Sequence, residues 1–393
     1  MIEVRAPGAL ERATGDAAAF LRDAWGRRAV FARAADPDGY EDLLTFDDVD
    51  RILSTMSLRT PTFRLVKAGE QIPESSYTRS GRTGSRPVSG MADPARIFEH
   101  FRRGATIVLQ GLHRYWEPVS IFVRELELEL GHPCQVNAYV TPPGAQGLAL
   151  HSDPHDVFVL QAFGGKHWEV RAAPGENRRE PIQAVVSTGD AIYMPTGTPH
   201  AANTQETLSG HLTVGVRVRS WREVVADAWK RVEADPALDD PMPAGWHRDP
   251  GAFASGLRER LSDAAGRLAG VDANDLGRAR ADRFLSTRAP LVRGVLADQL
   301  AAGAIDDATV VRRRRGSVCE IRSGGERLVA LLGDRRIDMP AWLEPAMRRI
   351  AETPAFAVGE LAPQIGDPDS RAVLVRRLVR EGLLTPGSQA GDG

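Results

Sequence analysis

The sequence predicts a protein of mixed α and β structure with a strand-rich middle part. Three observations favour this class. Residues 131–217 alternate short strand-like runs with Pro and Gly turns, the flanking segments show helical apolar spacing, and the composition is that of an ordinary folded protein. With 393 residues, 42% of them hydrophobic and 26% charged, the chain is long enough for two or three domains.

The first 130 residues mix helix and strand signals. Apolar spacing predicts helices over 17–25 and 46–56, with Asp47 or Asp48 near the N-cap of the second. Short apolar runs predict strands over 63–67 and 106–109. Between these strands, residues 75–90 (SSYTRSGRTGSRPVSG) are polar, Gly-rich and basic. We expect a mobile surface loop there, which could also serve as a lid.

The middle block contains several short runs that read as strands, separated by turn residues. We predict strands over 135–141, 157–162, 166–171, 191–194 and 212–217. The pair Gly164-Gly165 is expected to form the turn of a hairpin between the second and third of these runs. Many short strands at close spacing predict a sandwich or a barrel.

The last third of the chain reads as mostly helical. Residues 218–305 are rich in Ala, Leu and Arg, with a linker over 235–251, and Leu257, Leu261 and Leu268 fall on one helical face. Strand-like pieces are expected around Arg312–Arg315, in an arginine run whose ordinary interpretation is a solvated surface. We further predict helices over 342–352, 358–365 and 370–381.

Charge and composition exclude several classes of protein. The formal net charge of −2 gives no bulk basic field, so a nucleic-acid partner is not expected. No uncharged apolar run approaches the ~18 residues of a membrane span, and the N-terminus lacks a secretory signal. Two cysteines cannot build a disulfide framework, so we expect a cytoplasmic protein.

The chemistry-bearing residues lie in the strand-rich block. His151 and Asp153 form a His-x-Asp pair, whose side chains point the same way on an extended strand. Alone this would be an ordinary surface pair. Residues 189–200 (GDAIYMPTGTPH) predict a turn, a strand and a second turn in a hairpin that returns His200 beside an earlier strand. Together the three residues fit the 2-His-1-carboxylate triad that suits Fe(II). The ordinary alternative is that His200 is a polar histidine in a loop.

Two strings carry a resemblance to a known family. Residues 189–200 resemble the second cupin motif, and residues 135–170 resemble the JmjC-type ribosomal oxygenases, a branch of the 2-oxoglutarate/Fe(II) oxygenases. The string FLRDAWGRR near residue 20 is similar to the first helix of that family. The resemblance implies a double-stranded β-helix (JmjC/cupin) catalytic domain over 1–228, a helical dimerisation domain over 229–305 and a winged-helix domain over 306–393.

The resemblance also implies an activity and site residues. The family couples oxidative decarboxylation of 2-oxoglutarate to hydroxylation of a protein side chain, here arginine or histidine of a ribosomal protein, and the enzyme is expected to be a homodimer. His151, Asp153 and His200 fall on the catalytic iron ligands. Lys166 falls on the residue that binds the distal carboxylate of 2-oxoglutarate, and Asn137 falls on a pocket asparagine; Thr213 could add a hydroxyl.

The residues themselves leave alternatives open. Lys166 is one of three lysines against 47 arginines, which favours a role weakly, although it could be a solvated lysine at a hairpin end. Pro154-His155 departs from the family pattern where the substrate should bind. His155 could contact the substrate, but a plain loop histidine is the default. His211 could line the pocket, but a hydrogen-bonded histidine within the barrel is the ordinary expectation.

Two other functions remain possible at this point. The same chemistry could act on a peptide natural product or a tRNA. The cupin could also be a non-catalytic sensor attached to a DNA-binding winged helix. Residues 340–393 hold six arginines against seven acids, which is not the charge of a typical DNA reader. The sequence contains no Walker, G-x-G-x-x-G, G-x-S-x-G or C-x-x-C motif.

Overall fold

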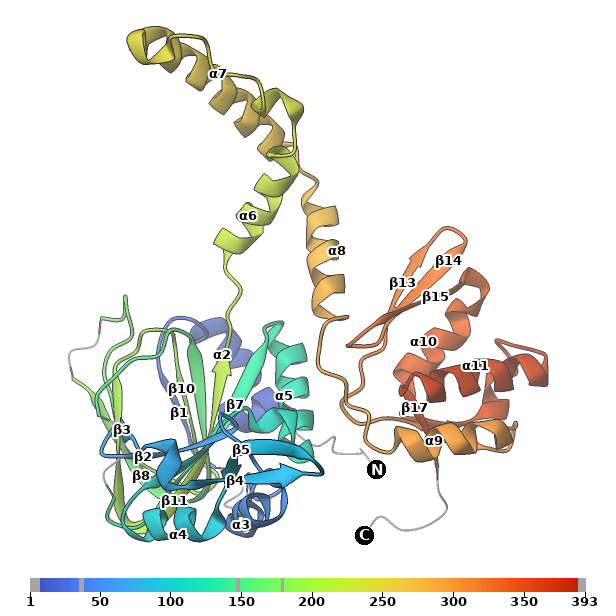
Figure 1. Cartoon of the computed structure of the whole chain (residues 1–393). Coiled ribbons are helices and arrows are strands. Elements are labelled where there is room, and N and C mark those ends of the chain that lie inside the picture. Colours follow the sequence, from blue (N-terminus) through green and yellow to red (C-terminus); the bar gives the residue numbers. More distant parts are fainter. Residues whose placement is uncertain (1–7, 35–38, 146–148, 178–179, 388–393) are drawn as a thin grey trace. The chain divides into compact units, whose positions relative to one another are not determined.

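The computed structural model describes residues 8–34, 39–145, 149–177 and 180–387 (Figure 1). The chain divides into two compact units, 1–218 and 219–393, and each is described by itself. The domain boundary expected at residue 228 falls inside helix α6 (Trp221–Val232). The division into three functional domains stays a prediction.

In its described residues, the first unit combines five α-helices with a large antiparallel sheet. The helices are α1 (Ala9–Thr14), α2 (Ala17–Asp23), α3 (Phe46–Thr55), α4 (Pro94–Arg102) and α5 (Glu117–Leu130). The helices predicted over 17–25 and 46–56 are therefore confirmed. Thr45 is the N-cap of α3, because its Oγ1 accepts a hydrogen bond from the backbone N–H of Asp48, and the Asp48 carboxylate accepts one from the N–H of Thr45.

The strands of this unit form one sheet of nine and a separate pair. They are β1 (Val30–Ala32), β2 (Phe63–Lys67), β3 (Glu70–Gln71), β4 (Thr78–Thr83), β5 (Arg86–Ala92), β6 (Thr106–Leu109), β7 (Cys134–Thr141), β8 (Asp156–Val170), β9 (Ile182–Ser187), β10 (Ala191–Met194) and β11 (His200–Val216). The order in the sheet is β1-β10-β8-β11-β7-β6-β2-β3, with β9 also pairing β8. The strands predicted over 63–67, 106–109, 135–141 and 191–194 are confirmed.

The hairpin predicted at Gly164-Gly165 is wrong, because residues 156–170 form the single long strand β8. Gly164 has a φ of 64°, and an added Cβ would lie 1.8 Å from the carbonyl oxygen of Leu208. The glycine therefore accommodates an irregularity within the strand pair instead of reversing the chain. Strand β11 runs antiparallel along nearly all of β8, with register shifts on either side of Ser209 and Gly210.

The second predicted hairpin also differs from the structure. Strand β10 does not pair with β11, because β8 lies between them in the sheet. His200 nevertheless lies beside earlier strands as expected: it pairs with Val170 of β8 and forms an isolated bridge with His151.

Alternation along the long strands separates the core from the site. Residues 136, 138 and 140 of β7, 158 and 160 of β8, and 212, 214 and 216 of β11 belong to one apolar cluster that includes residues of α1 to α5. Their neighbours 135, 137 and 139, 157 and 159, and 211, 213 and 215 line a cavity on the opposite face. Because successive strand side chains point to opposite faces, the same strands supply both a core and a site.

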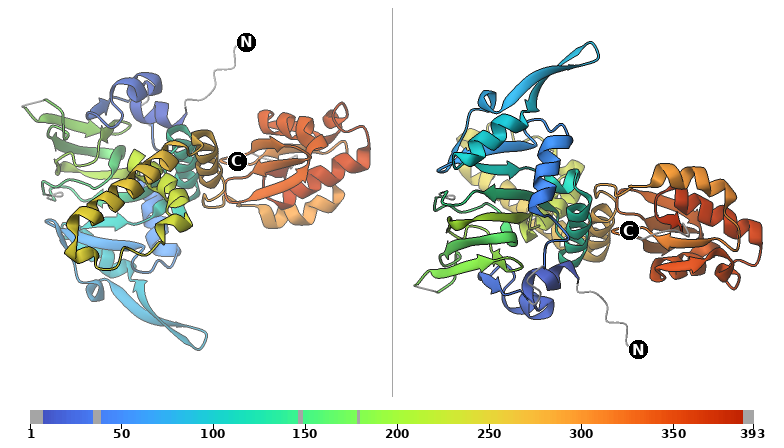
Figure 2. Two further views of the ribbon diagram at one scale, coloured as in Figure 1. Left: turned by 90° about the horizontal axis from the view of Figure 1, so that it is seen from above. Right: turned by 90° about the horizontal axis from the view of Figure 1, so that it is seen from below.

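The loop predicted over 75–90 is wrong, because most of it forms the two-stranded ribbon of β4 and β5. Thr83 pairs with Arg86, and the two residues between them, Gly84 and Ser85, make the turn with Gly84 at a φ of 59°. The ribbon projects from the rest of the unit (Figure 2). We call residues 78–92 the basic ribbon.

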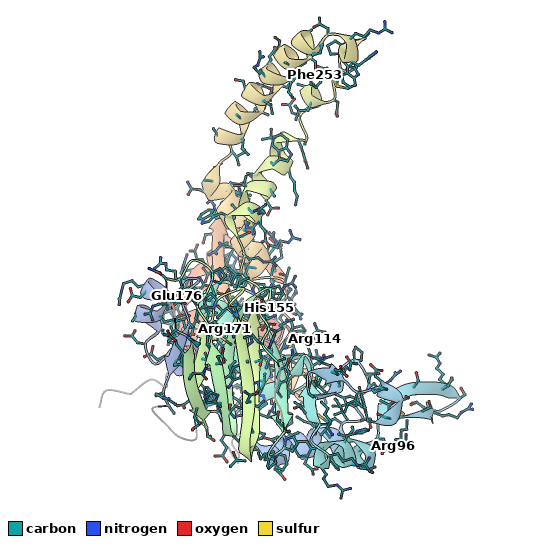
Figure 3. The ribbon with its side chains drawn as sticks, turned by 90° about the vertical axis from the view of Figure 1, so that its left-hand side faces the viewer. Arg96, Arg114, His155, Arg171, Glu176 and Phe253 are labelled. Atoms are coloured by element: carbon teal, nitrogen blue, oxygen red, sulfur yellow. The ribbon has the colours of Figure 1, made fainter. Side chains whose placement is uncertain are left out.

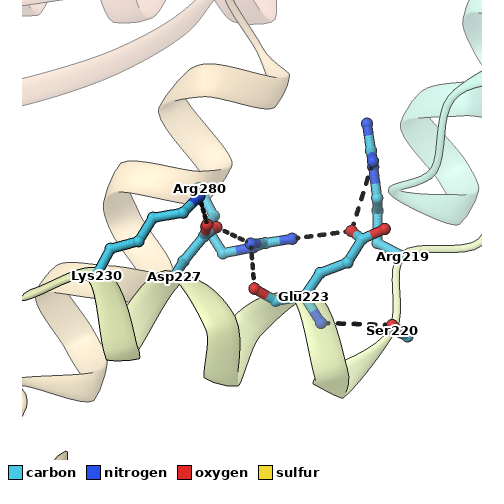
Figure 4. Close-up of polar contacts among 6 residues, drawn as sticks. All are labelled: Arg219, Ser220, Glu223, Asp227, Lys230 and Arg280. Atoms are coloured by element: carbon cyan, nitrogen blue, oxygen red, sulfur yellow. Dashed lines mark hydrogen bonds and ion pairs between the residues drawn. The ribbon is translucent and has the colours of Figure 1, made fainter. Parts of the chain in front are cut away.

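The second unit begins with the helices α6, α7 (Pro250–Ala269) and α8 (Ala273–Phe284). Arg280 of α8 ties the two outer helices together (Figure 4). It pairs with Asp227 of α6, and its guanidinium lies 3.4 Å from the carbonyl oxygen and 3.5 Å from the carboxylate of Glu223. The predicted apolar face of α7 is largely uncovered, since Leu257 and Leu261 are 46% and 58% exposed.

The rest of this unit holds two three-stranded sheets and three helices on one apolar core. The elements are α9 (Val295–Ala301), β12 (Val310–Arg313), β13 (Glu320–Gly324), β14 (Arg327–Leu331), β15 (Arg336–Pro340), α10 (Glu344–Glu352), β16 (Ala355–Ala357), α11 (Pro368–Arg380) and β17 (Leu384–Pro386). Helices predicted over 342–352 and 370–381 are confirmed. The one predicted over 358–365 is only a 3-10 turn over Val358–Leu361, in a segment with Gly359, Pro363 and Gly366. Among the described residues, no helix is long and apolar enough to span a membrane.

Candidate active site

His151, Asp153 and His200 come together at one end of the long strands. One potential ligand atom from each lies within 4.8 Å of the others. The Nε2 of His200 is 3.6 Å from the Oδ2 of Asp153, and the two imidazole centroids are 4.4 Å apart. Backbone bonds fix this arrangement. His151 N–H donates to the His200 carbonyl at 3.0 Å, the reverse bond is 2.8 Å, and Gly197 N–H donates to the Asp153 carbonyl at 2.9 Å.

The hydrogen bonds of the two histidines leave the same ring nitrogen free on each. The Nδ1 of His151 lies 2.8 Å from the carbonyl of Ala149, and the Nδ1 of His200 lies 3.0 Å from the carbonyl of Thr198. A carbonyl oxygen can only accept, so Nδ1 carries the proton in both rings and Nε2 keeps its lone pair. Metal-binding histidines in proteins are typically oriented in this way.

Burial also favours the neutral form of His200. The side chain is 4% exposed, and desolvation lowers its pKa below the ordinary value, with His151 adding to the effect. A neutral imidazole is the form that binds a metal ion. Two imidazoles and one carboxylate in this geometry fit a divalent first-row metal such as Fe(II).

Lys166 lines the same cavity and is 3% exposed. Its Nζ donates to the Oγ1 of Thr141 at 3.0 Å, and no carboxylate of the described residues pairs with it. Burial lowers its pKa to about 7. A buried ammonium without a counter-ion costs free energy, so the cavity has an electrostatic vacancy that an anionic group would fill.

The other two predicted residues also line this cavity, which opens to solvent and has a volume of about 100 Å³. Asn137 and Thr213 are directly opposite each other on β7 and β11. The Oδ1 of Asn137 accepts a hydrogen bond from the N–H of Gly111 at 3.0 Å, which fixes the amide and leaves its NH₂ as a donor. All six predicted residues therefore surround one space.

The sequence prediction missed Tyr139, which lines the cavity, and Thr141, which does not line it but holds Lys166. Both lie on β7 at positions i+2 and i+4 from Asn137, so strand alternation alone could have indicated them. Tyr139 lines the cavity and stacks on His211, with ring centroids 5.2 Å apart. Thr141 is fully buried and bonds both Lys166 and Thr106.

We expected His211 to be a hydrogen-bonded histidine within the barrel, and for the Nδ1 atom of its ring this expectation is wrong. That atom is buried and has no hydrogen-bond partner among the described residues, and the ring lines the cavity. Burial lowers the pKa of His211, and the charge of Lys166 adds to this effect. His211 is therefore neutral near neutral pH, and it also packs against Trp168, whose ring is both core and cavity wall.

His155 is more than a plain loop histidine. It precedes β8, lines the cavity, and lies at the end of the long strands (Figure 3). Its ring lies over Gly215, where an added Cβ would be 2.8 Å from the ring Cε1. Residues 151, 153 and 155 thus all reach the same space.

Comparison with known proteins identifies the class of this domain. Residues 121–224 match the JmjC domain family. "Ribosomal oxygenase 1" of Gallus gallus is 30% identical over 220 residues, which are 51% of this chain and 35% of that protein. "Bifunctional lysine-specific demethylase and histidyl-hydroxylase NO66" of Drosophila persimilis is 31% identical over 218 residues, 50% of this chain and 29% of that protein. This chain thus spans about a third of the length of these curated relatives.

Solved structures show the same fold over nearly the whole chain. Two structures of YcfD, a ribosomal oxygenase from Escherichia coli, cover 94% of this chain, and 98% of each is matched. One contains cobalt and succinic acid (18% identity, TM-score 0.55), and the other contains cobalt and 2-oxoglutarate (18% identity, TM-score 0.52). The chain therefore contains a JmjC domain with a cupin-like fold, and the resemblance to the JmjC-type ribosomal oxygenases is confirmed.

Proposed function

We propose that this protein is a 2-oxoglutarate- and Fe(II)-dependent oxygenase that hydroxylates an amino-acid side chain of a ribosomal protein. The observation that carries the proposal is one cavity lined both by the His-Asp-His set and by a buried lysine without a described counter-ion. The first suits the metal and the second suits the far carboxylate of a dicarboxylate co-substrate.

In this proposal His151, Asp153 and His200 would hold Fe(II), which would supply the oxygen chemistry with 2-oxoglutarate and O2. The two Nδ1–H groups keep both imidazoles in the binding tautomer. Asp153 supplies the negative charge that balances the ion. His200, Lys166, Asn137 and Thr213 lie on strands. His151 and Asp153 lie in the segment before β8, and backbone hydrogen bonds to His200 and Gly197 keep their geometry fixed while the substrate side chain is positioned.

Lys166 would hold the distal carboxylate of 2-oxoglutarate. Thr141 positions the ammonium through the 3.0 Å hydrogen bond, and the apolar surroundings that lower its pKa also strengthen its attraction to an anion. The amide of Asn137 and the hydroxyl of Thr213 face the same cavity and can donate to co-substrate oxygens. The side chain of the client would enter past His155.

The client class is the finer part of the proposal: arginine first, histidine second, in a ribosomal protein. It is supported by the names of the similar proteins, two of which are called ribosomal oxygenases and one a histidyl-hydroxylase. The test is to incubate the enzyme with Fe(II), 2-oxoglutarate and ribosomal-protein peptides and to look for one added oxygen by mass spectrometry. If no peptide gains oxygen and ribosomes of a deletion strain are also unchanged, the client lies elsewhere, and a peptide natural product or a tRNA becomes the leading candidate.

We also propose that the second unit supplies a helical dimerisation domain and a winged helix. Exposed apolar side chains on α6 and α7 favour dimerisation, including Trp221 at 83% and Leu261 at 58% exposure. A DNA-reading winged helix is the weaker alternative. Of the arginines on α11, Arg371 is buried and paired with Asp307, Arg376 donates to a carbonyl at 2.7 Å, and Arg377 pairs with Glu381. Of the four arginines on α11, only Arg380 is both exposed and without a partner among the described residues, so little positive charge is left on this helix for a phosphate backbone.

A further inference from the structure

The basic ribbon, residues 78–92, carries positive charge that the candidate active site does not use. Arg79, Arg82 and Arg86 are exposed, and residues 75–92 contain no acidic residue. No carboxylate of the described residues pairs with these three guanidinium groups. Arg82 donates a hydrogen bond within the ribbon, to the carbonyl of Ser85 at 2.8 Å. The charge of the three side chains is therefore available to a partner.

Two more arginines stand at the base of the ribbon. The Nε of Arg59 donates to the carbonyl of Ser89 at 3.0 Å, and Arg96, which Figure 3 labels near the ribbon, donates to its backbone and pairs with Asp93. The acidic residues that flank the ribbon in the sequence are Glu74 and Asp93. The ribbon and its base thus hold five arginines and only two acidic residues, although the formal net charge of the whole chain is −2. The excess of positive charge is therefore local to the basic ribbon.

The arginines occupy both faces of the ribbon. Arg82 is opposite Pro87 and Arg86 is opposite Thr83 in the antiparallel register. Neighbouring cross-strand pairs point to opposite faces, so Arg82 and Arg86 project in opposite directions. Both faces are exposed near the tip, which means that the ribbon covers no core there. An isolated two-stranded ribbon is marginally stable in water, so such an element is well suited to a contact.

The composition of the ribbon favours a polyanion over a protein surface. Between residues 79 and 88 only Pro87 and Val88 offer apolar side chains, whereas the centre of a protein interface is usually aromatic and apolar. Arginine forms charge-assisted, bidentate bonds with phosphate and needs no apolar burial to do so. Gly81, Gly84 and Ser85 let the backbone approach closely, and backbone N–H groups are common phosphate contacts.

We propose that the basic ribbon binds the phosphate backbone of RNA without reading its sequence. No exposed aromatic side chain on the ribbon is available to stack on a base, which is the usual means of reading single-stranded RNA. The choice of RNA over DNA rests on the proposed function, because a ribosomal client is assembled with RNA. The ribbon would then bring the enzyme to RNA-associated protein.

The test is a titration of the full chain into fluorescein-labelled single-stranded and duplex RNA, followed by fluorescence anisotropy at about 50 and about 200 mM salt. The wild type should bind RNA, more weakly at the higher salt. The variant R79Q/R82Q/R86Q should bind at least about tenfold more weakly, and the slope of log affinity against log salt should fall by about 2–3, one for each lost phosphate contact.

The matched control is R258Q/R278Q/R283Q, which removes the same charge from exposed arginines of α7 and α8 that pair with no described carboxylate. It should keep wild-type RNA affinity. Circular dichroism and thermal unfolding should be unchanged in both variants. Three results would overturn the proposal: no RNA binding by the wild type, equal weakening in both variants, or equally tight and ribbon-dependent binding of labelled polyglutamate, which would indicate an acidic protein partner.

The RNA assay contains no iron, 2-oxoglutarate or client, so its outcome is separate from that of the proposed oxygenase. No ribbon residue lines the cavity, and the ribbon variant should keep the basal production of succinate. If the protein binds RNA but does not turn over 2-oxoglutarate, only the proposed oxygenase activity is contradicted. If the protein turns over 2-oxoglutarate but does not bind RNA, only the proposal for the basic ribbon is contradicted.

Discussion

Asp153 supplies the anionic side chain of the candidate metal site, beside His151 and His200. Replacing it with Ala leaves only the two imidazoles and no anionic ligand, and we predict that Asp153→Ala abolishes 2-oxoglutarate turnover, measured as succinate. Ser152→Ala is the matched control, because Ser152 lies between the two predicted ligands but is exposed and does not line the cavity. Wild-type succinate production by Asp153→Ala would show that the assignment of the triad is wrong.

Lys166 is the lysine among the described residues that line the cavity. Losing one charge-assisted hydrogen bond costs about 1.5–3 kcal/mol, so Lys166→Ala should raise the KM for 2-oxoglutarate roughly ten- to a hundredfold. Lys166→Arg should keep much of the activity. Lys230→Ala, which removes an exposed lysine of α6, should leave the KM unchanged. If the KM is the same in Lys166→Ala, another cation binds the co-substrate.

The lowered pKa of Lys166 also predicts a dependence of binding on pH. Burial places the pKa of the empty site at about 7, and a bound carboxylate would raise it. Above pH 7 the empty site is neutral, so binding must take up a proton, and affinity should fall by up to about tenfold per pH unit. Calorimetric titration in two buffers of different ionisation enthalpy measures the uptake. Lys166→Arg should lose this pH dependence, and a pH-independent wild type would contradict the prediction.

At the scale of elements, the irregularity in β8 depends on Gly164. Its φ is positive, and the carbonyl oxygen of Leu208 would lie only 1.8 Å from an added Cβ, which leaves no room for a side chain. Gly164→Ala should therefore destabilise the first unit by at least about 1–3 kcal/mol, seen as a lower unfolding temperature in calorimetry. Gly277→Ala, at an open position of α8, is the control and should not lower it. Equal unfolding temperatures for Gly164→Ala and wild type would show that the strand relaxes around the new methyl group.

At the scale of the whole molecule, we predict a homodimer held by the helices of residues 229–305. Sedimentation at micromolar concentration should give twice the 42.7 kDa of one chain. Leu257→Asp with Leu261→Asp should produce monomers, because both side chains are exposed on α7 and a buried unpaired charge is costly. Val373→Asp, at a 62% exposed position of α11, should leave the dimer intact. A wild-type monomer would disprove the prediction.

The sequence by itself determined the local structure wherever a short-range signal was strong. Strands over 63–67, 106–109 and 191–194 were predicted with the bounds that the structure gives, because compact apolar runs have few alternatives. The His-x-Asp spacing and the string ending at His200 predicted three residues that lie within 4.8 Å of one another. The motif thus identified the three residues, but Asp153 lies before β8 and not on a strand, and the backbone bonds between His151 and His200 are what bring the set together.

Only the tertiary structure decided the pairing of the long strands and the environment of the site. Gly164-Gly165 has the local signature of a turn, but β11 pairs along both sides of it and keeps β8 continuous. Residues 75–90 look like a loop because the ribbon has no apolar face, and pairing between its own two strands holds it instead. The lowered pKa of Lys166 and the Nδ1 of His211, which lacks a described partner, arise from burial among residues distant in sequence, which no local pattern encodes.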